Sequence, residues 1–64
     1  MSLSQRERTV VELVADGHTD VEIATLLDVT LSTVRTHLES ARTKLDARNR
    51  AHCAVIAVRK GIIF

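Results

Sequence analysis

The stretch that decides the fold is residues 20–46, DVEIATLLDVTLSTVRTHLESARTKLD. From residue 31 onward its apolar residues recur every three or four positions: Leu31, Val34, Leu38, Ala41 and Leu45. This spacing predicts a long helix with one apolar face, because a helix turns once in about 3.6 residues. The opposite face carries short polar and charged side chains: Ser32, Arg35, Thr36, Glu39, Arg42 and Thr43. We therefore expect the helix to bury one side and to present the other to a polar, anionic partner.

A shorter helical pattern precedes the long one. Residues 20–27 predict a helix, and only Asp28, Val29 and Thr30 separate the two patterns. Two helices joined by such a short turn, the second with an Arg- and Thr-rich outer face, are typical of a helix-turn-helix DNA reader. The segment at about residues 31–46 is then the predicted recognition helix in the major groove of duplex DNA.

Residues that favour helix starts divide the whole chain into four helices: Ser4, Thr19, Thr30 and Asn49. Glu7 and Glu22 follow the first two at the spacing of a capping box, in which each side chain accepts a hydrogen bond from the other residue's backbone. Gly17 and Gly61 fit the ends of the first and fourth helices. The predicted fold is all-α and four-helix bundle-like, with the helix-turn-helix in the second and third helices.

Apolar positions predict one small core. The first two helices are expected to bury Val10, Val11, Leu13, Val14, Ile23, Ala24, Leu26 and Leu27. Ile62, Ile63 and Phe64 are expected to fold back onto this core.

Composition limits the classes of protein that fit. The 64 residues, 45% of them hydrophobic and 27% charged, predict one small globular domain over residues 1–64. The single cysteine, Cys53, excludes an internal disulfide and suits the reducing cytoplasm, the expected location. No apolar run approaches the ~20 residues that span a membrane, so no membrane partner is expected.

Charge is distributed unevenly along the chain. Residues 1–30 contain two basic and six acidic residues, for a net charge of −4. Residues 31–64 contain seven basic and two acidic residues, for a net charge of +5. The positive half includes the long helix, where a phosphate backbone would be met. Taken alone, the asymmetry fits equally well a protein with an uneven surface charge.

A family resemblance rests on spaced positions along nearly the whole chain. They are Leu3-Ser4, Arg6-Glu7, Gly17, Thr19, Glu22-Ile23-Ala24, Leu27, Val29-Thr30, Thr33-Val34-Arg35-Thr36-His37, Lys44-Leu45 and Arg48-Asn49-Arg50. In these positions the sequence resembles the LuxR/GerE-type DNA-binding domain of bacterial transcription regulators. The resemblance implies a third helix that lies in the major groove and a fourth that pairs two subunits on two half-sites. Such domains usually follow a sensor or phosphoacceptor domain, as in response regulators, so we expect an excised effector domain or a stand-alone regulator.

The resemblance also implies roles for individual residues. Base contacts are expected from Arg35, Thr36 and Glu39, and phosphate contacts from Ser32, Thr33, Lys44, Arg48, Asn49 and Arg50. Glu39 is expected to accept a hydrogen bond from cytosine N4. An ion pair of Glu39 with Arg35 or Arg42 is the alternative.

The fourth helix, about residues 50–60, is apolar nearly all round. The family's inward positions correspond to Cys53, Ile56 and Ala57, which leaves Ala51, Val55 and Val58 on an outward stripe. The expected use of this stripe is a weak homodimer that DNA strengthens. The alternative is a weakly apolar surface without a partner.

Other chemistry has little support in the sequence. His18, His37 and His52 are too scattered for a metal motif, and no nucleophile stands beside a base. We expect no catalysis, no cofactor and no small-molecule ligand. RNA polymerase is a further expected partner. The competing hypothesis is a helical protein-interaction module, or a promoter-recognition domain without operator binding of its own.

Overall fold

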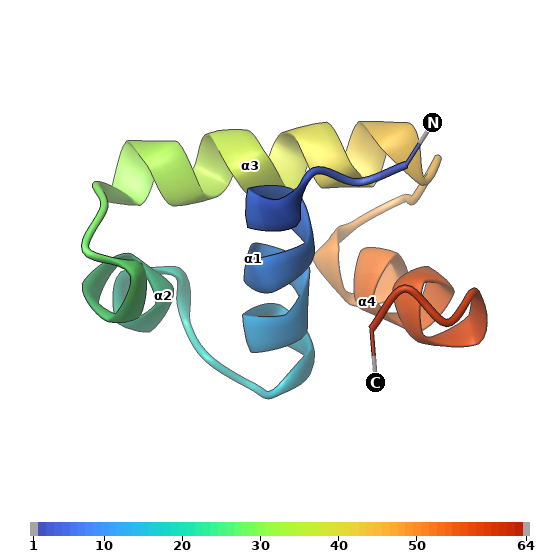
Figure 1. The fold of residues 1–64 in the computed structure, drawn as a ribbon, viewed down its shortest axis with the longest axis horizontal. Coiled ribbons are helices and arrows are strands. Elements are labelled where there is room, and N and C mark those ends of the chain that lie inside the picture. The colour runs from blue at the N-terminus through green and yellow to red at the C-terminus, as the bar shows by residue number, and fades with distance from the viewer. Residues whose placement is uncertain (1, 64) are drawn as a thin grey trace.

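The computed structural model describes residues 2–63 and contains the helices α1 (Gln5–Ala15), α2 (Asp20–Leu27), α3 (Leu31–Lys44) and α4 (Arg50–Arg59). The long helix α3 spans one side of the molecule, α1 crosses beneath its middle, and α2 and α4 lie on either side of α1 (Figure 1). The predicted all-α class is confirmed. None of the helices within residues 2–63 combines the length and apolarity needed to span a bilayer.

Helix boundaries follow the predicted caps. In the first capping box the Ser4 N–H donates to Glu7 Oε1 at 2.8 Å, and Ser4 Oγ accepts from the Glu7 N–H at 3.1 Å. Thr19 and Glu22 form the same pair of hydrogen bonds at 2.8 and 3.2 Å. The side chains of Thr30 and Asn49 cap α3 and α4. Because local hydrogen bonds fix each start, the helices begin where the sequence predicts them.

The core consists of two groups of buried side chains that α1 and α3 join. One group packs α1 and α3 against α4 and the C-terminal segment: Leu3, Val11, Ala41, Leu45, Ala47, Cys53, Ala57 and Ile63. The other packs α1 and α3 against α2 through Val10, Ile23 and Val34. The predicted return of the C-terminal segment is confirmed by Ile63, which is fully buried, while Phe64 lies outside the described residues.

The predicted burial of one residue is wrong. Leu26 was expected to be buried, but its side chain is 59% exposed, and Val21 on the same helix is 63% exposed. The eight-residue helix α2 packs through one narrow stripe, in which Ile23 is buried and Leu27 partly buried. Leu26 lies about 100° around the helix from Leu27, so one stripe does not bury both. The consequence is an exposed apolar area on α2.

Candidate nucleic-acid interface

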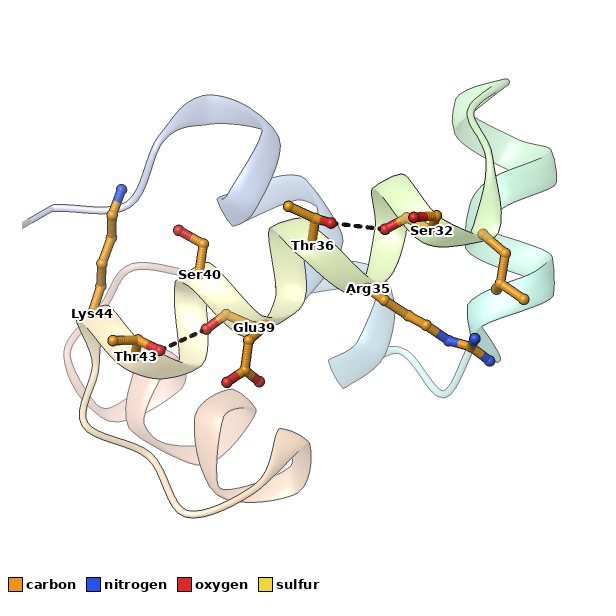
Figure 2. Close-up of a pocket in the computed structure, with 8 residues that line it drawn as sticks. Ser32, Arg35, Thr36, Glu39, Ser40, Thr43 and Lys44 are labelled. Carbon is orange, nitrogen blue, oxygen red and sulfur yellow. Dashed lines mark hydrogen bonds between the residues drawn. The ribbon is translucent and has the colours of Figure 1, made fainter.

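The outward face of α3 forms a shallow groove along most of the helix. It is lined by Leu31, Ser32, Arg35, Thr36, Glu39, Ser40, Thr43 and Lys44. Figure 2 shows Arg35 and Glu39 leaving the helix on one side, and Ser40 and Lys44 leaving it on the other. The three predicted base-contact residues, Arg35, Thr36 and Glu39, all line this groove. Ser40 and Leu31 line it too, although the sequence did not predict them as site residues.

Hydroxyl groups on this face are fixed by hydrogen bonds to their own helix. Thr36 Oγ1 donates to the carbonyl of Ser32 at 3.0 Å, and Thr43 Oγ1 donates to the carbonyl of Glu39 at 3.0 Å. Thr33 Oγ1 lies 2.9 Å from the hydroxyl of the N-cap residue Thr30. Because both hydroxyl protons are donated to helix carbonyls, the oxygens of Thr36 and Thr43 are available to a ligand as hydrogen-bond acceptors. Rotation of either hydroxyl toward a ligand would make it a donor.

Arg35 shares an acidic partner with the first residue of α4. Its Nε lies 3.8 Å from Oδ2 of Asp20, the first residue of α2, and its side chain is 66% exposed. Arg50 NH1 donates to the other oxygen of Asp20, Oδ1, at 2.6 Å. One carboxylate thus joins three helices. The partners are 15 and 30 residues apart in sequence, so no local pattern predicts this contact.

Glu39 forms a two-point ion pair with Arg42. Arg42 donates from Nε to Oε2 at 2.9 Å and from NH2 to Oε1 at 2.5 Å. The hydrogen bonds from Arg42 hold the pKa of Glu39 below its ordinary value. The third donor of Arg42, NH1, reaches the carbonyl of Ala47 at 2.8 Å and so ties the end of α3 to the following turn. Of the two ion pairs considered for Glu39, the one with Arg42 is present.

Lys44 forms an ion pair with a buried carboxylate. Its Nζ lies 2.8 Å from Oε1 of Glu7, whose side chain is 7% exposed, while 22% of the Lys44 side chain remains exposed. Ser40 Oγ donates to the other oxygen, Oε2, at 2.5 Å. Hydrogen bonds from Lys44, Ser40 and the Ser4 backbone, in that order, lower the pKa of Glu7 from 4.5 to about 2. The predicted phosphate contact of Lys44 remains a prediction, and Nζ already has a partner within the protein.

The segment between α3 and α4 supplies the remaining predicted phosphate contacts. Arg48 and Asn49 are exposed. Asn49 Oδ1 accepts from the His52 N–H at 2.8 Å, and the Arg48 N–H donates to His52 Nδ1 at 3.0 Å. Both bonds leave the guanidinium of Arg48 and the side-chain amide protons of Asn49 available to a ligand. Within residues 2–63, the guanidinium of Arg48 takes part in no ion pair.

On α4 the predicted outward stripe is exposed. Ala51 is exposed, and the side chains of Val55 and Val58 are 43% and 52% exposed. Cys53 and Ala57 are fully buried, as predicted for the inward side. Burial raises the pKa of the Cys53 thiol, so this residue acts as a small core hydrophobe.

Comparison with known proteins agrees with this architecture. The model of the family described as "Bacterial regulatory proteins, luxR family" matches residues 1–57, which include all of α1, α2 and α3 and most of α4. The chain belongs to the LuxR family. The match confirms the predicted resemblance, and regulators of this family bind DNA through helix-turn-helix domains. α2 and α3 are the helices of that motif.

Curated relatives of this LuxR-family domain are transcription regulators. The chain is 39% identical to the transcriptional regulatory protein LiaR of Bacillus subtilis over 62 residues, 97% of the chain and 29% of that protein. It is 39% identical over 61 residues to the quorum-sensing regulator RhlR of Pseudomonas aeruginosa, 95% of the chain and 25% of that protein. The response regulator VraR of Staphylococcus aureus is 31% identical over 61 residues, 95% of the chain and 29% of that protein. The chain therefore spans less than a third of the length of these relatives.

Proposed function

We propose that residues 1–64 form a domain that binds duplex DNA sequence-specifically, as the effector part of a bacterial transcription regulator. One observation carries the proposal: the outward face of α3 is an exposed row of hydroxyl, guanidinium and carboxylate groups, while α2 packs behind the start of the helix. The major groove of B-form DNA admits one α-helix, and groups of this kind read its base edges. Membership of the LuxR family supports the same use of α3.

Three residues of α3 are the proposed base contacts. Arg35 has an exposed guanidinium that can donate two hydrogen bonds to guanine O6 and N7. Thr36 presents a hydroxyl fixed on the same face. Glu39 accepts two hydrogen bonds from Arg42, and a carboxylate has about four acceptor sites, so it retains capacity for cytosine N4.

Phosphate contacts are proposed on both sides of this row. The residues are Ser32, Thr33, Lys44, Arg48, Asn49 and Arg50. They lie near the start of α3, at its end, and in the segment that leads into α4. A helix lying in the groove brings both of its ends close to the sugar–phosphate backbones that border the groove.

A homodimer on paired half-sites is part of the proposal. The exposed residues Ala51, Val55 and Val58 offer an apolar stripe far smaller than the ~800 Å² per partner of a standard interface. Free dimers should therefore be weak. Two copies held on adjacent half-sites raise each other's effective concentration, so DNA strengthens the pairing.

A protein-interaction module is the second candidate function, and one observation favours it. Val21 and Leu26 expose large apolar side chains on the outer side of α2, where both line a shallow hollow that shares no residue with the groove of α3. RNA polymerase remains a proposed partner under either function. A module that binds only proteins would show no affinity for duplex DNA.

The salt dependence of duplex binding tests the proposal. Contact with about four to six phosphates per subunit predicts a slope of about −4 to −5 in a plot of log K against log salt concentration. Fluorescence anisotropy with a labelled duplex, selected from a random pool, measures this slope. Affinity that hardly changes between low and physiological salt would contradict the proposal.

A further inference from the structure

A single carboxylate lies between two of the arginines that are proposed to contact DNA. Asp20 Oδ1 accepts a 2.6 Å hydrogen bond from Arg50 NH1, and Asp20 Oδ2 lies 3.8 Å from Arg35 Nε. The Asp20 side chain is only 21% exposed, so water competes weakly for it. The shorter contact has the length of a strong charge-assisted hydrogen bond.

The other cations around α3 show how widespread such pairing is. Of the five basic residues from Arg35 to Arg50, four have an acidic partner within the protein; the pairs are Arg35–Asp20, Arg42–Glu39, Lys44–Glu7 and Arg50–Asp20. Only Asp20 is shared by two arginines from different helices. Its loss would therefore free more positive charge toward a DNA backbone than the loss of any other acid in this set.

We propose that Asp20 is an internal counterion that competes with DNA for two arginines, the proposed phosphate contact Arg50 and the proposed base contact Arg35, and thereby lowers the affinity of the domain. The proposal rests on the DNA-binding function proposed above. In the free protein, Asp20 holds Arg50 against the first turn of α2. A phosphate that approaches the start of α4 has to displace this carboxylate and is repelled by it. Asp20 thus weakens binding to every duplex, and Arg50 contributes less than an unpaired arginine would.

Asp20→Asn is the direct test, because asparagine keeps the shape of the side chain and removes its charge. We expect binding to a duplex about two- to fivefold tighter than in the unsubstituted protein, from the usual strength of partly exposed ion pairs. The log–log salt slope should become steeper by up to about one, since one more phosphate is effectively neutralised. Thermal unfolding confirms that the variant is folded.

Asp28→Asn is the matched control. Asp28 also lies at an end of α2, is exposed, and makes no ion pair within residues 2–63. Its φ of 55° is a left-handed conformation that asparagine tolerates well. If Asp20 acted only through general repulsion, both substitutions would tighten binding equally, and that outcome would overturn the proposal.

A double-mutant cycle with Arg50→Gln identifies the competing pair. The proposal predicts that Arg50→Gln weakens binding more in the Asp20→Asn background than in the unsubstituted protein, because Arg50 is then free for phosphate. Equal losses in both backgrounds, or weaker binding by Asp20→Asn, would show instead that the carboxylate is neutral or helps to orient the arginines.

A measurement without DNA separates this proposal from the proposed function. The ion pair predicts slow rotation of the Arg50 guanidinium in ¹⁵N NMR spectra of the free protein, and fast rotation in Asp20→Asn. Fast rotation in both proteins would overturn the counterion role even if DNA binds well. If the ion pair is present but no variant binds a duplex with salt-dependent affinity, the DNA-binding function itself fails, and the proposal fails with it.

Discussion

Replacing Lys44 with methionine should destabilise the fold, because the substitution removes the cation beside a buried carboxylate. Glu7 would keep hydrogen bonds from Ser40 and from the Ser4 backbone but would lose its partner 2.8 Å away. The pKa of Glu7 falls from 4.5 to about 2, and this difference corresponds to about 3 kcal/mol of stability from all its partners together.

The share of Lys44 is smaller than this total, because other donors contribute and 22% of the lysine side chain is exposed to screening solvent. We expect a loss of about 1–2 kcal/mol at pH 7, which corresponds to a fall of about 5–15 °C in the melting temperature of so small a domain. Circular dichroism during heating measures it. Lys60→Met is the matched control, since Lys60 is exposed at the end of α4.

The pH dependence has a definite sign. The folded pKa of Glu7 is lower than its unfolded value, so its contribution is complete above about pH 5 and is lost as the pH falls toward 2. The difference in melting temperature between Lys44→Met and the unsubstituted protein should therefore shrink between pH 5 and pH 2. A difference that is absent at pH 7, or that is constant down to pH 2, would refute this reasoning.

The remaining predictions concern DNA. Arg35→Ala should cost about 1–3 kcal/mol on the preferred duplex and relax the preference at one base pair, as measured by competition with single-base variants. Lys44→Met, assayed well below its melting temperature, should weaken all sequences alike and flatten the salt slope by up to about one, because Lys44 is already paired with Glu7. Equal losses for Arg35→Ala and Lys44→Met on specific and random DNA would contradict these separate roles. Glu39→Gln should tighten binding to random duplex more than to the preferred one, whereas weaker binding to every duplex would show that the ion pair with Arg42 is its main role. Val55→Glu should abolish cooperative binding to a duplex with two half-sites and leave the melting temperature unchanged; retained cooperativity would place the dimer surface elsewhere.

The fold could be predicted from local patterns because its helix ends are encoded locally. Ser4 with Glu7 and Thr19 with Glu22 are three residues apart, and their reciprocal hydrogen bonds form within one turn. The apolar spacing of α3 predicted a buried side, which the structure confirms at Val34, Ala41 and Leu45. Leu26 shows the limit of such patterns, since two adjacent leucines fit the period but one narrow stripe buries only one of them.

The ion pairs of the candidate site could not be predicted in the same way. Lys44 and Glu7 are 37 residues apart, and Arg50 and Asp20 are 30 residues apart. Only the packed arrangement of the helices brings them together. One signal was present: Glu7 precedes Val10 and Val11 by three and four residues, which places its carboxylate on the buried face of α1. The capping box already accounted for Glu7 in the sequence, so its second role, as the partner of Ser40 and Lys44, was not predicted.

The central claim is that the outward face of α3 is the surface that meets DNA, and NMR mapping tests it most directly. Titration of a ¹⁵N-labelled chain with a selected duplex at physiological salt should shift the backbone signals of Ser32, Arg35, Thr36 and Glu39 most strongly. The signals of Val21 and Leu26 on the outer side of α2 should move little. Shifts concentrated on that side of α2, or no shifts at all with a duplex in excess, would contradict the account.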